Sequence, residues 1–185
     1  MTDKKEKNSD YYDNVYKQYK HYSLDVDGYH TCYTQLYLFV KNLLQKEEKI
    51  LELGCGTGQF AEILINEGYN YKFGIDFSEY AIQLSKERCK INLFMKYDLY
   101  DLEISKIDFD TIIALEVFEH LENDIKIINS IPSKKRVIFN VPSYNDTSHV
   151  RFFKEPDDVE KRFKPEFNFF KINELGKIYI IEGIK

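Results

Sequence analysis

Residues 50–60, ILELGCGTGQF, constrain the fold more than any other stretch of this chain. Alternating aliphatic side chains lead into glycines at positions 54, 56 and 58, and a second apolar run follows. Glycine tolerates backbone conformations that other residues avoid, and it leaves the main chain bare for close approach. The pattern predicts a strand, a tight turn and a helix, with the turn facing a ligand at the end of the strand.

The strand-then-helix pattern repeats along the chain. Apolar strand-like runs are predicted at 49–54, 71–76, 91–98, 109–116 and 136–142, and helices at 58–68, 79–90, 120–131 and 155–163. Such alternation predicts a Rossmann-like, doubly wound α/β fold with a mostly parallel sheet. Two further strands surround an NELG turn at 173–176, which is too short for a crossover helix. We therefore expect seven strands, with one antiparallel strand near the C-terminus.

The chain before the first strand has a different character. Aromatic residues at positions 11, 12, 16, 19 and 22 recur mostly three or four apart, and a second apolar pattern covers 29–44, so both stretches are predicted to be helical. We expect one domain overall: a helical segment at 1–45, packed on the core as a possible lid, and a core at 46–185. Tyr11 and Tyr12 are our candidates for contacts to the cleft.

Charge and cysteine content narrow the setting. The net charge of −5 disfavours a protein that grips nucleic acid along its length, because that binding depends on many Lys and Arg contacts. Three widely spaced cysteines suggest neither a disulfide framework nor a zinc knuckle. The first ten residues lack the apolar core of a secretory signal, and no run is long enough to span a membrane. We expect a soluble, cytoplasmic protein.

An acid at the end of the second strand suggests what the glycine turn holds. Asp76 follows Gly58 by 18 residues, where a carboxylate can bind both hydroxyls of a ribose. The dinucleotide fingerprint requires glycine or alanine at position 59, which is Gln59 here, so a nicotinamide oxidoreductase is disfavoured. The sequence predicts a nucleoside-bearing cofactor of another kind.

The segment ELGCGTG, with the acids that follow the next strands, closely resembles the class I S-adenosylmethionine-dependent methyltransferases from about Lys49 to the C-terminus. The resemblance implies that S-adenosylmethionine is the cofactor and S-adenosylhomocysteine its product. It also implies roles for Glu52 in orienting the loop and for Asp76 in binding ribose. The other implied cofactor contacts are Gly54, Cys55, Gly56, Gly58, Phe77, Asp98, Leu99 and Glu116.

Two of the four histidines follow strands at the edge where the cofactor is expected. His120 follows the fourth strand and His149 the fifth, so either imidazole is a candidate to remove a proton from an acceptor hydroxyl. For both residues a structural role is the competing interpretation. We expect a methyltransferase acting on a small molecule, with oxygen favoured over nitrogen. The acceptor, the methylated atom and the oligomeric state stay open.

Two other functions compete with this interpretation, which uses no metal. If a helical turn begins at Glu116, then Glu116, Glu119 and His120 share a face, with His149 as a fourth ligand from the neighbouring loop. That set is similar to the metal site of small-RNA 3′-end ribose methyltransferases and implies a metal-assisted enzyme acting on RNA. The second alternative is a subunit that binds S-adenosylmethionine without turnover.

Overall fold

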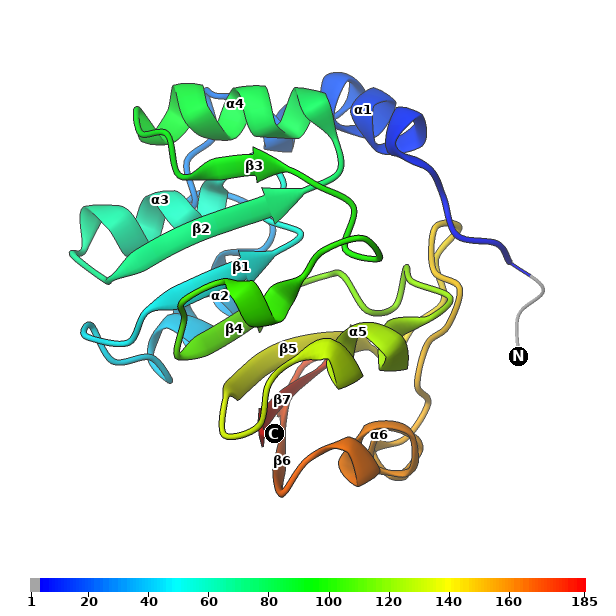
Figure 1. The fold of residues 1–185 in the computed structure, drawn as a ribbon. Helices are drawn as coiled ribbons and strands as arrows, with labels where there is room; N and C mark the ends of the chain where they lie inside the picture. Colours follow the sequence, from blue (N-terminus) through cyan, green and yellow to red (C-terminus); the bar gives the residue numbers. More distant parts are fainter. Residues whose placement is uncertain (1–3) are drawn as a thin grey trace.

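A seven-stranded sheet forms the centre of the computed structural model, which describes residues 4–185. The strand order is β3-β2-β1-β4-β5-β7-β6, and β7 alone runs antiparallel to its neighbours, as the sequence predicts (Figure 1). The strands are β1 (Ile50–Leu53), β2 (Tyr71–Asp76), β3 (Phe94–Lys96), β4 (Thr111–Ala114), β5 (Arg136–Pro142), β6 (Phe169–Leu175) and β7 (Ile178–Ile184).

The helices match the predicted alternation, although several are shorter than expected. They are α1 (Ser9–Gln18), α2 (Thr34–Lys41), α3 (Gln59–Asn66), α4 (Glu79–Cys89), α5 (Asp124–Ser130) and α6 (Pro156–Phe163). Short 3₁₀ turns are η1 (Lys20–Tyr22), η2 (Ile104–Lys106) and η3 (Lys164–Glu166). The predicted helix over 10–22 ends at Gln18 because Tyr19 is extended, and the one over 120–131 begins only at Asp124.

Helices cover both faces of the sheet, and the alternation of side chains along each strand decides which face each residue serves. On one face, Ile50 and Ile113 pack with the apolar sides of α2, α3 and α4. On the other, Leu51 and Ile112 pack with α5 and α6. Burial on both faces explains why the central strands are nearly continuous apolar runs.

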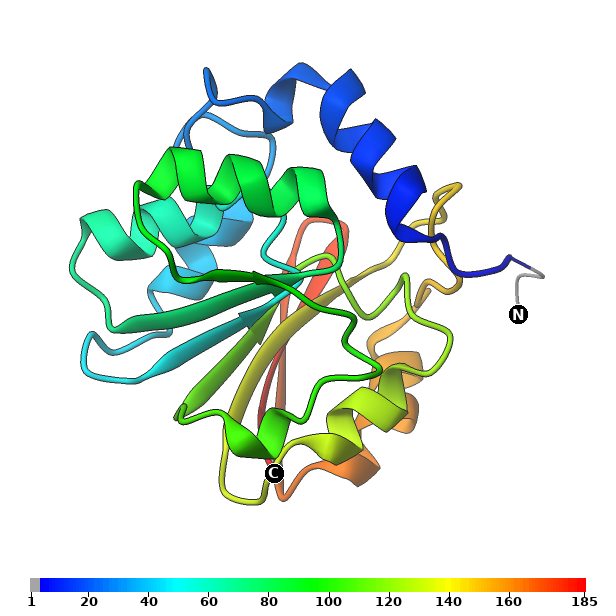
Figure 2. The ribbon, with the colours of Figure 1, turned by 45° about the horizontal axis from the view of Figure 1, so that its top comes forward.

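The carboxyl ends of β1, β4 and β5 meet at one edge of the sheet, and α1 lies beside that edge next to α4 (Figure 2). Asp13 in α1 accepts hydrogen bonds from the Ser78 hydroxyl and from the backbone N–H of Tyr80, 3.4 Å away. The Ser78 hydroxyl in turn accepts from the N–H of Ala81 and caps α4. The N-terminal helix is thus tied to the start of α4.

A buried carboxylate fixes the long connection after β5. Asp124, at the start of α5, is fully buried and pairs with Arg162 of α6 and with Arg151 of the loop, whose nitrogen lies 3.0 Å from the carboxylate. Arg151 also donates to the carbonyls of Phe118 and Leu121 in the loop after β4. These bonds lock the two loops together. Within residues 4–185, every helix is too short or too polar to cross a membrane.

Candidate functional site

The glycine turn after β1 is held by the acid that ends β2. Gly54 and Gly56 have φ values of 68° and 51°, in the region that favours glycine. The Asp76 carboxylate accepts hydrogen bonds from the N–H groups of Gly56 and Ser78, both at 2.9 Å. Asp76 is 5% exposed, and burial raises its pKa to about 6. One carboxylate therefore fixes both the glycine turn and the start of α4.

Gly58 also packs against a neighbouring helix, which was not expected. It also has a positive φ, 77°, but a Cβ at this position would lie 2.9 Å from the Cβ of Ser85 in α4. Gly58 lines neither of the cavities that the other glycines of the turn line. This glycine lets the start of α3 pack closely against α4, and its contact to the cofactor stays a prediction.

Glu52 is buried at the base of the turn, where it lines the larger cavity. Its carboxylate accepts a hydrogen bond from the Tyr71 hydroxyl at 2.6 Å. Burial raises the pKa of Glu52 to about 8. The hydrogen bond from Tyr71 acts to lower this pKa, and the nearby charge of Asp76 acts to raise it. The side chain thus connects β1, just before the glycine turn, to the first residue of β2.

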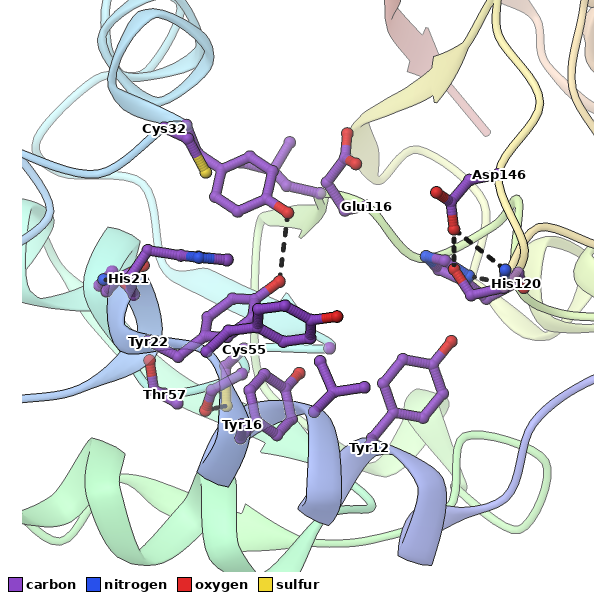
Figure 3. A pocket seen from close by; sticks show the side chains of 18 of the residues that line it. Tyr12, Tyr16, His21, Tyr22, Cys32, Cys55, Thr57, Glu116, His120 and Asp146 are labelled. Carbon is purple, nitrogen blue, oxygen red and sulfur yellow. Dashed lines mark hydrogen bonds between the residues drawn. The ribbon is translucent and has the colours of Figure 1, made fainter.

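The larger cavity, of about 380 Å³, lies above this turn, and we call it the chamber. Its floor includes Glu52, Gly54, Cys55 and Gly56, and its far wall includes Glu116, His120 and His149. In Figure 3, Tyr12 and Tyr16 enter from α1, while Glu116 and His120 enter from other sides. No Lys or Arg side chain of residues 4–185 lines the chamber.

A smaller cavity, of about 80 Å³, adjoins the chamber and shares Gly54, Glu116 and His120 with it. Its own lining includes Asp76, Phe77, Asp98 and Leu99. The structure thus brings together at one place the residues that the resemblance assigns to the ribose and adenine of the cofactor.

Tyrosine side chains form much of the chamber wall. Of these tyrosines, only Tyr11 and Tyr12 were expected from the sequence to contact the cleft. The others lining the chamber are Tyr16, Tyr19, Tyr22, Tyr33, Tyr37 and Tyr144. The hydroxyls of Tyr22 and Tyr33 lie 3.2 Å apart, so these two side chains are joined by a hydrogen bond. The three- and four-residue spacing in α1 is a signal for Tyr16, because it places Tyr12 and Tyr16 on one face. Tyr33 and Tyr37 lie four residues apart in the stretch 29–44, whose pattern is helical, whereas no local pattern marks Tyr144.

Glu116 does not begin a helical turn. Its φ is 56°, a left-handed conformation, and its backbone N–H donates to the side-chain oxygen of Asn140 at 2.9 Å. The Asn140 amide donates back to the Glu116 carboxylate at 2.5 Å. The expectation that residues 116, 119 and 120 share a helical face is therefore wrong. Burial, followed by the charge of Glu119, raises the pKa of Glu116 to about 7.

Glu119, His120 and His149 nevertheless converge. Their potential ligand atoms all lie within 4.8 Å of one another, and the imidazole rings of His120 and His149 are 5.1 Å apart between centroids. Glu119 is fully buried and His149 is 3% exposed. Desolvation lowers the pKa of His120, and desolvation together with the charge of His120 lowers that of His149 to about 4.

The chamber offers polar groups suited to a polar guest such as the amino-acid end of S-adenosylmethionine. Tyr12 and Thr57 both line it, and their hydroxyls are buried with no hydrogen-bond partner among residues 4–185. A Cβ on Gly56 would point toward the hydroxyl of Tyr16, 3.3 Å away, so a larger residue would intrude on the space over the turn. These observations fit the cofactor that the turn and Asp76 predict.

Comparison with known proteins agrees with this geometry. A family model described as a methyltransferase domain matches residues 44–172, most of the chain. The chain belongs to the class I S-adenosylmethionine-dependent methyltransferases. The magnesium protoporphyrin IX methyltransferase of Synechocystis, crystallised with S-adenosylmethionine, has a TM-score of 0.62 and 20% identity, covering 82% of this chain and 76% of its own. This likeness shows that the two chains share a fold.

Curated relatives are similar over part of their length. An uncharacterized protein of Haemophilus influenzae is 29% identical over 140 residues, which are 69% of this chain and 54% of the relative. A putative protein N5-glutamine methyltransferase of Methanocaldococcus jannaschii is 34% identical over 76 residues, 38% of this chain and 39% of the relative. The chain thus spans about half or less of these relatives. S-Adenosylmethionine is the expected cofactor of this methyltransferase.

Proposed function

We propose that this protein transfers a methyl group from S-adenosylmethionine to a small-molecule acceptor at oxygen. The observation that carries the proposal is the chamber, because a single cavity joins the glycine turn to the imidazoles of His120 and His149. S-Adenosylmethionine supplies an electrophilic methyl group on a sulfonium. The protein's task is then to align the acceptor, and such alignment contributes about 7–11 kcal/mol to lowering a barrier.

The size and charge of the chamber support a small acceptor. A cavity of about 380 Å³ is near the lower end of small-molecule sites, and it must also receive part of the cofactor. Glu52 and Glu116 line it, and no Lys or Arg within the described chain does. A nucleic acid would bring phosphates, for which these walls offer no Lys or Arg side chain, so RNA fits this chamber poorly.

The two imidazoles support methylation at oxygen. A neutral hydroxyl is a poor nucleophile until a base removes its proton, whereas a neutral amine attacks without prior deprotonation. Each imidazole offers a nitrogen lone pair on the wall facing the glycine turn. We assign the handling of the hydroxyl proton to His149 and His120. In this proposal Glu52, Gly54, Cys55 and Gly56 contact the amino-acid end of the cofactor, with Tyr11 and Tyr12 above it, and α1 acts as a lid.

The adenosyl end would lie along the smaller cavity and the adjoining open hollow that shares Phe77 and Asp98 with it. Asp76 would hold the ribose, while Phe77, Asp98 and Leu99 would surround the adenine. Glu116 lines both cavities and so stands near the methyl group.

Calorimetry and product release together test the proposal. We expect the full chain to bind S-adenosylhomocysteine, and to release it from S-adenosylmethionine faster with small hydroxyl-bearing compounds than with the matching amines. His149→Ala should lower turnover while cofactor affinity stays within about twofold, and His30→Ala, which alters an exposed imidazole, should change neither. Binding without turnover on a broad panel of acceptors would instead indicate a non-catalytic subunit.

A further inference from the structure

A connected row of aromatic rings from the N-terminal segment lines the chamber. Between ring centroids, Tyr33 lies 6.4 Å from His21, and His21 lies 4.0 Å from Tyr22. Tyr22 lies 4.9 Å from Tyr16 in α1, and Tyr16 lies 6.5 Å from Tyr12. All five side chains line the cavity. The segment before the first strand therefore gives the chamber a continuous aromatic wall.

The row continues through the loops after β4 and β5. The centroid of His120 lies 5.7 Å from that of Tyr12 and 5.1 Å from that of His149. Tyr144 ends the row, 5.4 Å from His149. These rings line the same cavity, and we call the whole row, from Tyr33 to Tyr144, the aromatic belt. Segments far apart in the sequence thus place their rings around one space.

The two ends of the belt share a neighbour, the carboxylate of Glu116. Burial, followed by the charge of Glu116, raises the pKa of Tyr144 to about 12. Burial and the neighbouring Tyr22 raise the pKa of Tyr33, and the charge of Glu116 adds to this rise. One oxygen of this carboxylate accepts from Asn140, and the other accepts no hydrogen bond from residues 4–185. A carboxylate oxygen that is free to bind a guest therefore lies within electrostatic reach of both ends of the belt.

The charges around this space are negative. Within residues 4–185, no Lys or Arg side chain lines the chamber. Desolvation lowers the pKa of His21, as it does for the other two imidazoles of the belt, so all three are neutral at neutral pH. Besides Glu52 and Glu116, Asp146 lines the cavity, and chiefly the N–H of Ser148 lowers its pKa, so this carboxylate is ionised. The chamber is therefore suited to positively charged guests.

Neutral aromatic rings and carboxylates together form a site for a cation. The face of an aromatic ring carries partial negative charge, and proteins bind alkylammonium groups in cages of such rings. We propose that the methyl acceptor is a cationic alcohol, whose ammonium group lies between the ends of the aromatic belt beside Glu116. This inference rests on the proposed function, because the hydroxyl of the same molecule must then reach His120 or His149.

The cofactor is itself positively charged, so the chamber must serve two cations when the acceptor carries one. Glu52 lies beside the glycine turn, on the side assigned to the amino-acid end of the cofactor. The free oxygen of Glu116 and the carboxylate of Asp146 then remain for the acceptor. Their negative charge offsets the repulsion between an ammonium and a sulfonium, which neutral walls would not do.

The ammonium group takes no part in the bond changes of the transfer. The acceptor oxygen forms a bond to the methyl carbon, the electron pair of the C–S bond stays on sulfur, and the hydroxyl proton passes to an imidazole lone pair. Holding the ammonium fixes where the hydroxyl lies, and such alignment is the main contribution expected of the protein.

Choline and 3,3-dimethylbutan-1-ol form a matched pair of probes, because they have the same shape and differ in a quaternary nitrogen replaced by carbon. Calorimetry on the full chain saturated with S-adenosylhomocysteine measures both affinities while the cofactor site is filled. We expect choline to bind at least about tenfold more tightly, as a desolvated cation–π contact provides. Equal affinities, tighter binding of the neutral alcohol, or no detectable binding of choline would overturn the proposal.

Variants of the belt show whether its rings supply this preference. Tyr33→Leu and Tyr144→Leu should each lower choline affinity about three- to tenfold and leave that of the neutral alcohol within about twofold. Tyr33→Phe keeps the ring and should keep most of the choline affinity. Glu116→Gln removes the charge, can still accept from Asn140, and should also narrow the preference. Tyr29→Leu, which alters an exposed ring outside the chamber, is the matched control and should change neither affinity.

An undiminished preference for choline in both leucine variants would contradict the role of the belt. Thermal melting checks that the variants fold. If they do not fold, the comparison of the two probes on the wild-type chain decides the matter.

Turnover with S-adenosylmethionine keeps this inference and the proposed function separate. The nitrogen of choline already carries four carbons, so a methyl group can be added only to its oxygen. We expect S-adenosylhomocysteine to be released faster with choline than with the neutral alcohol. Tight choline binding without release would count against the proposed function and leave the cation site standing. Equal release with both alcohols would support the proposed function and overturn this inference.

Discussion

Replacing Asp76 by asparagine tests the link between the glycine turn and the cofactor. The carboxylate accepts two backbone hydrogen bonds, from Gly56 and Ser78, each at 2.9 Å. Asparagine keeps one acceptor oxygen and turns an NH₂ group toward the other N–H, so one bond is lost. A hydrogen bond to a charged group contributes about 1.5–3 kcal/mol, and this is the expected fall in the free energy of unfolding.

The same loss should weaken cofactor binding. The freed glycine turn must be reordered when S-adenosylhomocysteine binds, and about 1.5–3 kcal/mol corresponds to roughly 10–100-fold in affinity. Isothermal calorimetry on Asp76→Asn measures the affinity, and urea unfolding measures the stability. Asp108→Asn is the matched control, because that exposed carboxylate pairs only with Lys49 and should change affinity by less than twofold. An Asp76→Asn affinity within twofold of wild type would refute the reasoning.

The pH dependence of binding follows from the same carboxylate. Burial raises the pKa of Asp76 to about 6, so the ionised form that accepts both N–H bonds predominates above pH 6 and disappears below it. Affinity should therefore fall as the pH drops, by about tenfold between pH 8 and pH 5 for a group that must be ionised to bind. Burial also raises the pKa of Glu52 to about 8 and that of Glu116 to about 7, so these carboxylates contribute to the same pH range. The part of the pH profile that disappears in Asp76→Asn is therefore the part due to Asp76. A profile unchanged in that variant would assign the effect elsewhere.

Two further predictions concern stability and are checked by urea unfolding. Gly58→Ala should cost about 1–3 kcal/mol more than Gly68→Ala, because both glycines have φ near 78° but only the first would bring a Cβ within 3.0 Å of another residue, Ser85. Equal losses would mean that the backbone conformation alone matters. Asp124→Ala should cost about 3–5 kcal/mol because it leaves two partly buried arginines without their carboxylate, whereas exposed Glu103→Ala should cost under about 1 kcal/mol.

The parts of the site that depend on residues close together in the chain were predictable from the sequence. Strand, turn and acid lie within 27 residues from Ile50 to Asp76, and each has its own pattern, so the turn and its partner were expected where they occur. The packing of Gly58 against Ser85 was not expected, because the residue that requires a glycine there lies on α4. The left-handed conformation of Glu116 depends on Asn140, 24 residues away in the next strand. Sequence spacing does not reveal such a partner.

The tyrosines that line the chamber are a second case in which residues far apart in the sequence meet only in the folded protein. Tyr33 comes from a segment before the sheet and Tyr144 from the loop after β5, and only the completed fold brings them to one cavity. The four-residue spacing of Tyr33 and Tyr37 is typical of a helix but does not tell which cavity their rings reach, and Tyr144 follows no period. The convergence of Glu119 with His120 and His149 was expected from a helical turn that does not form. It arises instead because the loops after β4 and β5 are locked together through Arg151.

Tyr12 connects the two halves of the site. Its ring lies 5.4 Å from that of Phe77, at the smaller cavity, and 5.7 Å from that of His120, at the chamber wall. The ring belongs to α1, which Asp13 ties to the start of α4, where Asp76 also binds. A shift of the glycine turn or of Ser78 on cofactor binding would therefore be passed to α1 and to the imidazole beside the acceptor. Cofactor and acceptor sites that share one aromatic side chain are expected to be filled in a dependent order.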